Sequence, residues 1–326
     1  MLTTTLAGKT ACRLGFGCFP LTGGYGDISP AAAFRTIQAV LDAGVRILDT
    51  SDAYAAGANE ELVGRAVADR RESAVVVTKF GWVLDSFGNP IRRDGSPAYI
   101  RKACEASLRR LKTDYIDVYL QHRVDPGVSI EETIGELARL REAGKVRGFG
   151  LCEVSPGTLR RAAAVAPLAV LQTEYSLWAR EPAAELLPAC DALGIAFMAY
   201  SPLGRGFLAG AIRSPDQLGA ADFRRSQPRF EGANLQHNLR AVNALGRLAD
   251  RYGMTRSQLC LAWLLNQSPG LIPIPSTRSI EHFEENLRAL EMRLTSSQVT
   301  EVEEEVRTDQ IEGLRHPADH MKTIDL

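Results

Sequence analysis

Four polar residues that follow apolar runs are the side chains of this sequence best suited to chemistry. The run VRIL at 45–48 ends in Asp49, and Tyr54 comes five residues later. Lys79 closes the run AVVVTK, and His122 follows YIDVYLQ. Because a lysine that ends a buried strand is costly unless it is paired, we expect it to form an ion pair with Asp49.

Together these side chains predict the transfer of a proton to a carbonyl oxygen. An ammonium group close to Tyr54 would stabilise the phenolate, so we expect the pKa of Tyr54 to fall below about 10 and to suit a general acid. His122 would hold a substrate oxygen beside the phenol by a hydrogen bond. None of the four groups supplies electrons, so a hydride donor would have to come from a cofactor.

Each residue also has a simpler interpretation. Asp49 and Lys79 could form a purely structural ion pair, Tyr54 could pack a loop, and His122 could be a core histidine. A different class of enzyme, a barrel lyase, would use Lys79 to form a Schiff base with its substrate. That lysine must be neutral to attack, and pairing with Asp49 opposes this.

The elements that must position these residues alternate between strand and helix. Helix starts are clear at Ser29-Pro30, Ser96-Pro97 and Ser155-Pro156, where a capping hydroxyl precedes proline. This alternation, repeated to eight strands without a linker, predicts an α/β fold, a single (β/α)8 TIM barrel over 1–326. An open doubly wound sheet is the alternative, but it usually needs a Gly-rich phosphate turn, which we do not find. The apolar runs expected to form strands are 14–18, 45–49, 74–79, 115–121, 146–151, 168–173, 195–200 and 270–274.

The segments outside this repeat have expected places around the barrel. Residues 1–13 are predicted to form an N-terminal β-hairpin with Gly8-Lys9 at its turn. Two long connections, 80–96 and 201–233, each follow the C-terminal end of a strand, which is the face where barrel enzymes build active sites. The C-terminal tail, about 305–326, is expected to wrap over the same face.

Composition and charge argue against several classes of protein. The 326 residues are 45% hydrophobic and 24% charged, with a formal net charge of −1 and no run of Lys or Arg. We therefore expect neither a nucleic-acid partner nor a membrane span, which needs ~20 consecutive apolar residues. The N-terminus lacks the order of a signal peptide, so we expect a cytoplasmic protein. The scattered cysteines (12, 18, 104, 152, 190 and 260) predict reduced core thiols and no metal site.

Six motifs, in order along nearly the whole chain, give the sequence a resemblance to the aldo-keto reductase superfamily. They are ILDTSDAY, VVVTKFG, YIDVYLQHRVDP, LQTEYSLW, YSPLGRGFLAG and IPIPSTRSIEHFEENL. The segments EYSLWAR and FRRSQPRF resemble the bacterial subgroup that is similar to the potassium-channel β-subunit. The resemblance implies reduction of a small aldehyde or ketone by NADPH, with NADPH favoured over NADH. A regulatory NADPH-binding protein with slow turnover is the alternative, and the natural substrate and the oligomeric state stay open.

The resemblance also implies roles for individual residues. Tyr54 would be the proton donor, Lys79 with Asp49 the pair that tunes it, and His122 the group that orients the carbonyl. Aromatic residues expected to line the substrate pocket are Phe19, Trp82 and Trp178, of which Trp178 could equally pack in the core.

For the cofactor, the resemblance implies an extended NADPH bound without a Rossmann fold. Tyr200 would stack on the nicotinamide, Gln172 would bond its carboxamide, and the glycines of the 201–206 loop would admit the pyrophosphate. The 2′-phosphate would lie near Arg278 at a helix N-terminus. The expected cofactor residues are Cys152, Gln172, Tyr200, Ser201, Leu203, Gly204, Arg205, Gly206, Ser276, Thr277, Arg278, Ser279, Glu285 and Asn286.

Two positions depart from the family pattern. Cys152 stands where the family commonly has a serine that helps to hold the nicotinamide amide, and sulfur is a weaker hydrogen-bond partner. Ser276 replaces a glycine of the phosphate motif, and Arg278 stands alone where two basic residues are common.

Overall fold

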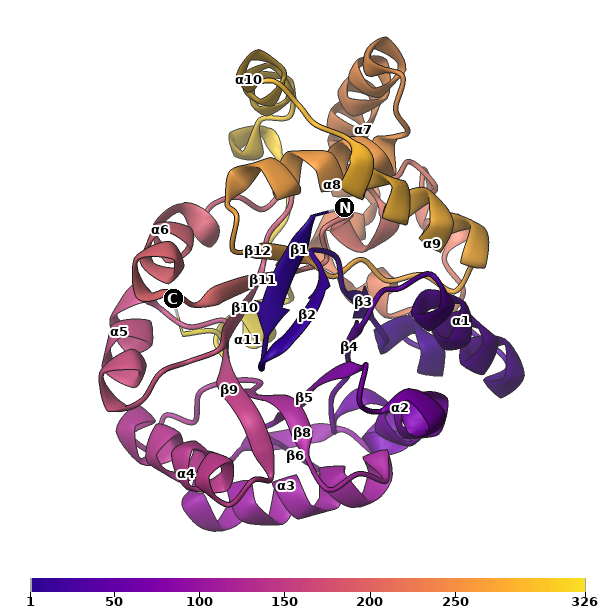
Figure 1. The fold of residues 1–326 in the computed structure, drawn as a ribbon. Coiled ribbons are helices and arrows are strands. Elements are labelled where there is room, and N and C mark those ends of the chain that lie inside the picture. The colour runs from indigo at the N-terminus through magenta and orange to yellow at the C-terminus, as the bar shows by residue number, and fades with distance from the viewer. Residues whose placement is uncertain (1, 326) are drawn as a thin grey trace.

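Eight parallel strands form the centre of the molecule. The computed structural model describes residues 2–325, and Figure 1 looks along the axis of the barrel that the strands make. Their order in the sheet is β12-β11-β10-β9-β8-β5-β4-β3, so strands that follow one another in the barrel repeat are neighbours. The strands are β3 (Phe16–Gly17), β4 (Ile47–Asp49), β5 (Val75–Phe80), β8 (Ile116–Gln121), β9 (Val146–Cys152), β10 (Val170–Glu174), β11 (Ala196–Tyr200) and β12 (Leu271–Pro273).

The sheet closes on itself between its first and last strands. The main-chain N–H of Gly15 donates to the carbonyl of Pro273 at 2.9 Å, and that of Gly17 donates to Pro275 at 3.1 Å. A Cβ at position 15 would lie 2.8 Å from the Ile274 side chain, so glycine permits the two ends of the sheet to approach this closely. The predicted (β/α)8 barrel is therefore confirmed.

Helices cover the outside of the barrel, and their predicted starts are confirmed. The hydroxyls of Ser29, Ser96 and Ser155 each accept a hydrogen bond from the main-chain N–H three residues later, with proline following the cap. The helices around the strands are α1 (Pro30–Asp42), α2 (Ala58–Val67), α3 (Pro97–Leu111), α4 (Ile130–Glu142), α5 (Pro156–Val165), α6 (Ala183–Leu193), α8 (Arg256–Gln267) and α9 (Ile280–Leu287). Two more, α7 (Gly232–Tyr252) and α10 (Ser296–Glu305), pack against each other outside this ring (Figure 1).

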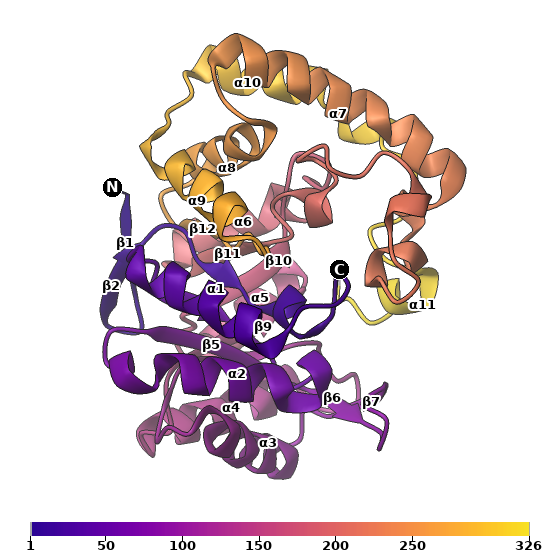
Figure 2. The ribbon, with the colours of Figure 1, turned by 90° about the vertical axis from the view of Figure 1, so that its right-hand side faces the viewer.

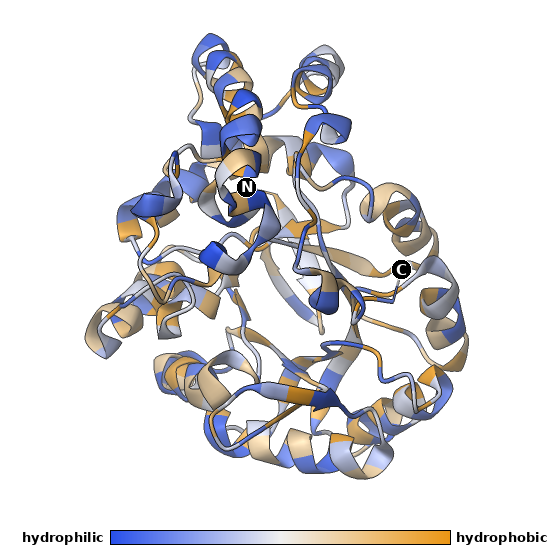
Figure 3. Ribbon diagram, turned by 180° about the vertical axis from the view of Figure 1, so that it is seen from behind, coloured by the Kyte–Doolittle hydropathy of each residue, from blue (hydrophilic) through white to orange (hydrophobic). Residues whose placement is uncertain are grey.

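Apolar side chains fill both sides of the sheet. In β5, Val75 and Val77 point into the barrel, whereas Val76 packs in the layer between sheet and helices. The helices carry apolar and polar residues side by side, as Figure 3 shows by hydropathy. Among residues 2–325, no helix is long and apolar enough to cross a membrane.

The predicted N-terminal hairpin covers one end of the barrel. It consists of β1 (Thr3–Leu6) and β2 (Lys9–Cys12), and it crosses in front of the strands in Figure 1. Its turn is at Ala7 and Gly8, whose φ angles are 50° and 77°, one residue earlier than predicted. Leu6 and Ala11 pack against the apolar residues inside the barrel, so the hairpin closes this end.

The opposite end, called the mouth below, carries both long connections and the C-terminal tail. The segment 80–96 folds into a second hairpin, β6 (Trp82–Leu84) and β7 (Pro90–Arg93). The connection after β11 contains the 3₁₀ turns η4 (Gly204–Gly206), η5 (Pro215–Gln217), η6 (Phe223–Ser226) and η7 (Pro228–Phe230). The tail contains α11 (Ala318–Met321), which lies with the second hairpin at the end away from the N-terminal hairpin (Figure 2).

Candidate active site

The four residues expected to transfer a proton meet at the mouth. Asp49 ends β4, Tyr54 begins the turn η2 (Tyr54–Gly57), Lys79 lies in β5 and His122 follows β8. Asp49, Tyr54 and His122 line a cavity of about 300 Å³, called the catalytic cavity below. Lys79 is fully buried beside them. Parallel strands end at the same face of a barrel, so residues far apart in the chain meet there.

Lys79 forms a buried ion pair with Asp49, as predicted. Its Nζ lies 2.8 Å from each carboxylate oxygen of Asp49 and donates a further bond of 2.8 Å to the carbonyl of Thr50. Burial is the largest effect and lowers the pKa of Lys79, but the carboxylate of Asp49 together with Tyr54 and Cys152 outweighs it, and the pKa lies above its usual value. The lysine is therefore charged at neutral pH, which argues against a Schiff-base mechanism.

Tyr54 reaches this ion pair, but the predicted fall of its pKa is wrong. The phenol oxygen lies 3.4 Å from Nζ of Lys79. Burial is the largest effect and raises the pKa of Tyr54 to about 12, although the ammonium of Lys79 acts in the opposite direction. The charge could be anticipated from the sequence, whereas the loss of water around the phenol could not. Tyr54 therefore keeps its proton at neutral pH, which is the form that a proton donor needs.

His122 lies edge-on to Tyr54, with ring centroids 6.1 Å apart and an angle of 78° between the planes. Its Nδ1 is 3.3 Å from Oγ of Ser51. Burial, together with the charges of Arg123 and Lys79, lowers the pKa of His122 well below its usual value. The imidazole is therefore neutral and available for hydrogen bonding. Ser51 was not predicted from the sequence, because no local pattern distinguishes a serine that contacts a distant histidine from any other loop serine.

Three residues expected to contact the nicotinamide also line the catalytic cavity. Gln172 donates from Nε2 to Oδ1 of Asp49 at 2.7 Å, so its amide is held by the ion pair. Tyr200 donates from its hydroxyl to Oε1 of Glu153 at 2.7 Å. Burial raises the pKa of the Cys152 thiol to about 12, so this side chain is an unreactive thiol at neutral pH.

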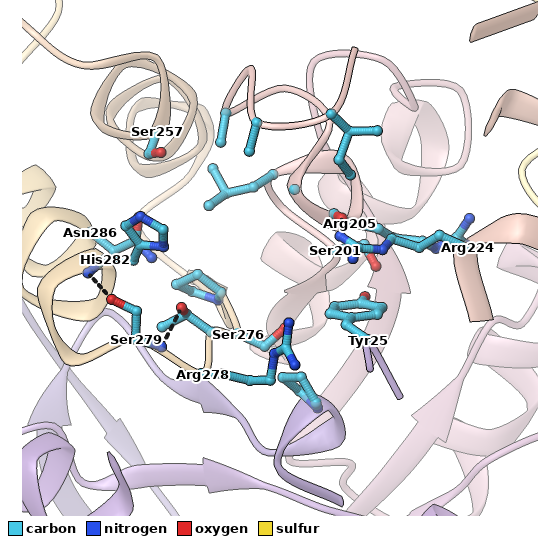
Figure 4. Close-up of a pocket in the computed structure, with 18 of the residues that line it drawn as sticks. Tyr25, Ser201, Arg205, Arg224, Ser257, Ser276, Arg278, Ser279, His282 and Asn286 are labelled. Atoms are coloured by element: carbon cyan, nitrogen blue, oxygen red, sulfur yellow. Dashed lines mark hydrogen bonds between the residues drawn. The ribbon is translucent and has the colours of Figure 1, made fainter. Parts of the chain in front are cut away.

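A second cavity of about 520 Å³, called the groove below, adjoins the catalytic cavity. Tyr25, Ser201, Arg205 and Ser276 line both. In Figure 4, Ser279, His282 and Asn286 lie on one side of the groove, and Ser201, Arg205 and Tyr25 lie on the other. The expected cofactor residues that line the groove are Ser201, Leu203, Arg205, Gly206, Ser276, Thr277, Arg278, Ser279, Glu285 and Asn286.

Side-chain hydroxyls accept hydrogen bonds from main-chain N–H groups at the start of α9, beside the groove. Oγ of Ser279 accepts from the N–H of His282 at 3.1 Å, and Oγ1 of Thr277 accepts from the N–H of Ser279 (Figure 4, dashed lines). Arg278 donates from Nη1 to the carbonyl of Asp27 at 2.7 Å, which holds its guanidinium at the edge of the groove. A helix start next to an arginine favours an anion.

Gly204 is the expected cofactor residue that lines neither cavity. A Cβ at this position would lie 2.7 Å from the ring of Trp178, so glycine lets the loop pass over the indole. Trp178 is 1% exposed and stacks on Phe207, with centroids 4.9 Å apart. It packs in the core and does not line the catalytic cavity, whereas Phe19 and Trp82 do.

The C-terminal tail lies over the mouth, as predicted, and adds residues that sequence analysis missed. His316 and His320 line the catalytic cavity, with ring centroids 4.5 Å apart. Arg315 donates two bonds of 3.2 Å to the carboxylate of Glu153, which ties the tail to the end of β9. No local pattern in the tail marked these residues.

This barrel holds a buried lysine–aspartate pair, a protonated phenol and a neutral imidazole beside a long groove. Fold and site together are those of a barrel enzyme with its active site at the mouth. Comparison with known proteins narrows the class, because residues 13–307 match the Aldo/keto reductase family. The chain belongs to this family.

Individual relatives agree with this assignment. The chain is 40% identical over 311 residues to the probable aldo-keto reductase 1 of Glycine max, and this alignment covers 95% of this chain and 89% of the relative. A solved structure of a glycerol dehydrogenase from Gluconobacter oxydans has a TM-score of 0.85 and 30% identity, over 94% of this chain and 95% of that one. An aldo-keto reductase from Klebsiella pneumoniae, solved in complex with NADPH, has a TM-score of 0.72 and 27% identity, over 96% and 100% of the two chains.

Proposed function

We propose that the protein reduces a small aldehyde or ketone to the alcohol with NADPH, and that Tyr54 donates the proton. The observation that carries the proposal is the 3.4 Å contact between the Tyr54 hydroxyl and the buried, charged Nζ of Lys79. An ammonium at this distance is placed to stabilise the negative charge that remains on the phenol after proton transfer.

The groove fits an extended dinucleotide. It runs on from the catalytic cavity, and it is lined by Arg278 and by residues at the N-terminal end of α9, where the helix dipole favours a phosphate. Ser201 and Arg205 have φ angles of 49° and 57°, a strained conformation that costs about 1–3 kcal/mol per residue and that gathers at ligand sites. The Klebsiella relative with bound NADPH supports this assignment. When bound, NADPH supplies the hydride for the carbonyl carbon.

The residues of this chain then control the substrate oxygen. His122 shares a hydrogen bond of 3.3 Å with the Ser51 hydroxyl through Nδ1, and its direction depends on the tautomer of the ring. In the tautomer that carries its hydrogen on Nε2, the imidazole can hold a carbonyl oxygen. Tyr54 gives its proton to the same oxygen as negative charge develops there. Lys79 stabilises the resulting phenolate, and Asp49 keeps Lys79 charged.

The test is a fluorescence titration with NADPH and NADH, followed by turnover of benzaldehyde. The variants are Tyr54→Phe and, as a matched control, Tyr252→Phe, because the Tyr252 hydroxyl bonds Glu301 between α7 and α10, away from both cavities. We expect tighter binding of NADPH than of NADH. We also expect Tyr54→Phe to lose roughly 100- to 10,000-fold in turnover while still binding NADPH.

The outcomes separate the possible roles of the protein. Turnover that survives in Tyr54→Phe would refute the assigned proton donor. Failure of both nucleotides to bind would refute the reductase function. Tight NADPH binding without turnover of any aldehyde would favour the regulatory alternative.

A further inference from the structure

Arg123 is a buried cation at the mouth, and no carboxylate of residues 2–325 forms an ion pair with it. It directly follows His122, is 4% exposed and lines the catalytic cavity. Its Nη1 donates to the main-chain carbonyl of His122 at 2.7 Å. Its Nε is buried and has no hydrogen-bond partner among residues 2–325. A guanidinium removed from water without a carboxylate partner is energetically costly, and an anionic ligand at this position would offset that cost.

The other charged side chains that line the catalytic cavity are paired. Asp49 is held by Lys79 at 2.8 Å, and Arg205 pairs with Glu174 at 3.3 Å. Within the described part of the chain, no carboxylate lies within salt-bridge distance of Arg123, because none of the ion pairs includes it. Arg123 is therefore the free positive charge of this cavity.

The nearby carboxylate of Glu153 is already occupied. It accepts two bonds of 3.2 Å from Arg315 and one of 2.7 Å from the hydroxyl of Tyr200. The main-chain N–H of Glu174 donates to it as well, at 2.9 Å. Glu153 thus serves the tail and the strand ends. Against the effect of burial, the charge of Arg123 helps that of Arg315 to lower the pKa of Glu153, but no hydrogen bond or ion pair among residues 2–325 joins Arg123 to this carboxylate.

Comparison with the other buried arginines shows that Arg123 is unusual. Arg13, Arg205, Arg229 and Arg315 are each 5–6% exposed, and each makes hydrogen bonds to at least two other residues. Within the part of the chain that the structure describes, Arg123 donates only to the carbonyl of the residue before it. The other four arginines hold parts of the fold together by these hydrogen bonds, and Arg123 has no such role.

The charge of Arg123 also acts on the histidines of the catalytic cavity. Burial, followed by the charge of Arg123, lowers the pKa of His320 to about 4. Burial and nearby arginines, including Arg205 and Arg123, lower the pKa of His316 as well. Both imidazoles are neutral at pH 7, so they add hydrogen-bonding groups to the cavity without adding charge.

We propose that Arg123 binds an anionic group of the substrate, a carboxylate or a phosphate, so that the preferred substrate is a negatively charged aldehyde or ketone. The inference rests on the proposed function and names its substrate class. Arg123 does not line the groove, so the phosphates of the cofactor do not account for it. Phe19, Trp82 and Phe223 line the same cavity, which suits an anion carried on a small apolar body.

The test compares kcat/KM for charged and neutral aldehydes of matched shape. The carboxylate arm uses 3- and 4-carboxybenzaldehyde against benzaldehyde, and the phosphate arm uses glyceraldehyde 3-phosphate against glyceraldehyde. The variants are Arg123→Gln and Arg123→Lys, with Arg160→Gln on the exposed surface of α5 as the control. Calorimetric titration of the wild type and variants with benzoate and with inorganic phosphate provides a readout without turnover.

We expect the wild type to prefer the charged member of at least one pair. Arg123→Gln should reduce that preference by roughly 10- to 100-fold, as expected for the loss of a charge-assisted hydrogen bond. Arg123→Lys should keep part of the preference, and Arg160→Gln should keep all of it. The arm that shows the preference identifies the anion as carboxylate or phosphate.

Failure of the inference is distinct from failure of the function. If the wild type reduces neutral aldehydes through Tyr54 but has no preference for a charged one, the function stands and the role of Arg123 is refuted. A preference that survives in Arg123→Gln also refutes it. If no aldehyde is reduced, the proposed function fails, and the calorimetric titrations alone decide whether Arg123 binds an anion.

Discussion

Replacing Asp49 by asparagine removes the negative charge that balances Lys79 while keeping the shape of the side chain. The new amide oxygen can still accept the hydrogen bond from Gln172, which now goes to Oδ1 of Asp49 at 2.7 Å. The remaining partners of Lys79 are the carbonyl of Thr50 and the hydroxyl of Tyr54, neither of which carries a charge. The substitution therefore leaves a fully buried ammonium without a counter-ion.

The expected loss of stability follows from that uncompensated charge. Removing one partner of a buried ion pair costs about 3–5 kcal/mol. For a protein of this size each kcal/mol lowers Tm by roughly 2 °C, so Asp49→Asn should lower Tm by roughly 6–10 °C. Lys79→Met leaves a buried carboxylate and should cost a similar amount.

The double variant Asp49→Asn/Lys79→Met removes both charges at once. Because neither a buried cation nor a buried anion remains, its stability should return to within about 1–2 kcal/mol of the wild type. Turnover should not return, since no ammonium is left beside Tyr54. Recovery of stability without recovery of activity would show that the ion pair serves the reaction and is not required for folding.

The assay combines thermal unfolding without cofactor and turnover of benzaldehyde for the wild type, both single variants and the double variant. If the two single losses of Tm simply add in the double variant, the charges do not interact as the 2.8 Å contacts require. If the double variant regains turnover, the assigned role of Lys79 is wrong.

Two further predictions concern the loop between the end of β4 and Tyr54. Ser51→Ala removes the hydrogen bond to Nδ1 of His122, so turnover should fall by roughly 3- to 10-fold with NADPH affinity unchanged, and Ser51→Thr should restore part of it. An equal loss in Ser51→Thr would contradict a positioning role. Burial, with the charge of Glu60, raises the pKa of Asp52 to about 8, whereas the pKa in the unfolded chain is near 4. The folded protein therefore holds this proton more tightly, and the stability that the proton contributes is lost as the pH rises from about 4 to about 8. Asp52→Asn should therefore exceed the wild type in Tm most clearly at pH 8–9 and much less at pH 5, and a difference independent of pH would exclude this explanation.

The sequence by itself determined the elements and the positions of the candidate catalytic groups. Apolar runs without polar alternation marked the strands, and Ser-Pro pairs marked helix starts such as Ser96-Pro97, because both are local consequences of backbone hydrogen bonding and burial. Polar residues at the ends of those runs, including Asp49 and Lys79, could be placed together because parallel strands end on one face. The resemblance to the reductase family added the expected groove residues, of which Gly204 alone lines neither cavity.

The tertiary structure alone decided how those groups behave. The pKa of Tyr54 depends on how much water the surrounding residues exclude, and this amount is the sum of contacts from several strands and loops. The bond from Gln172 to Asp49 and the pairing of Arg315 with Glu153 join residues far apart in the chain, which no local pattern encodes. A sequence shows which charges are present, but only the folded chain shows which of them are paired and which, such as Arg123, are left for a ligand.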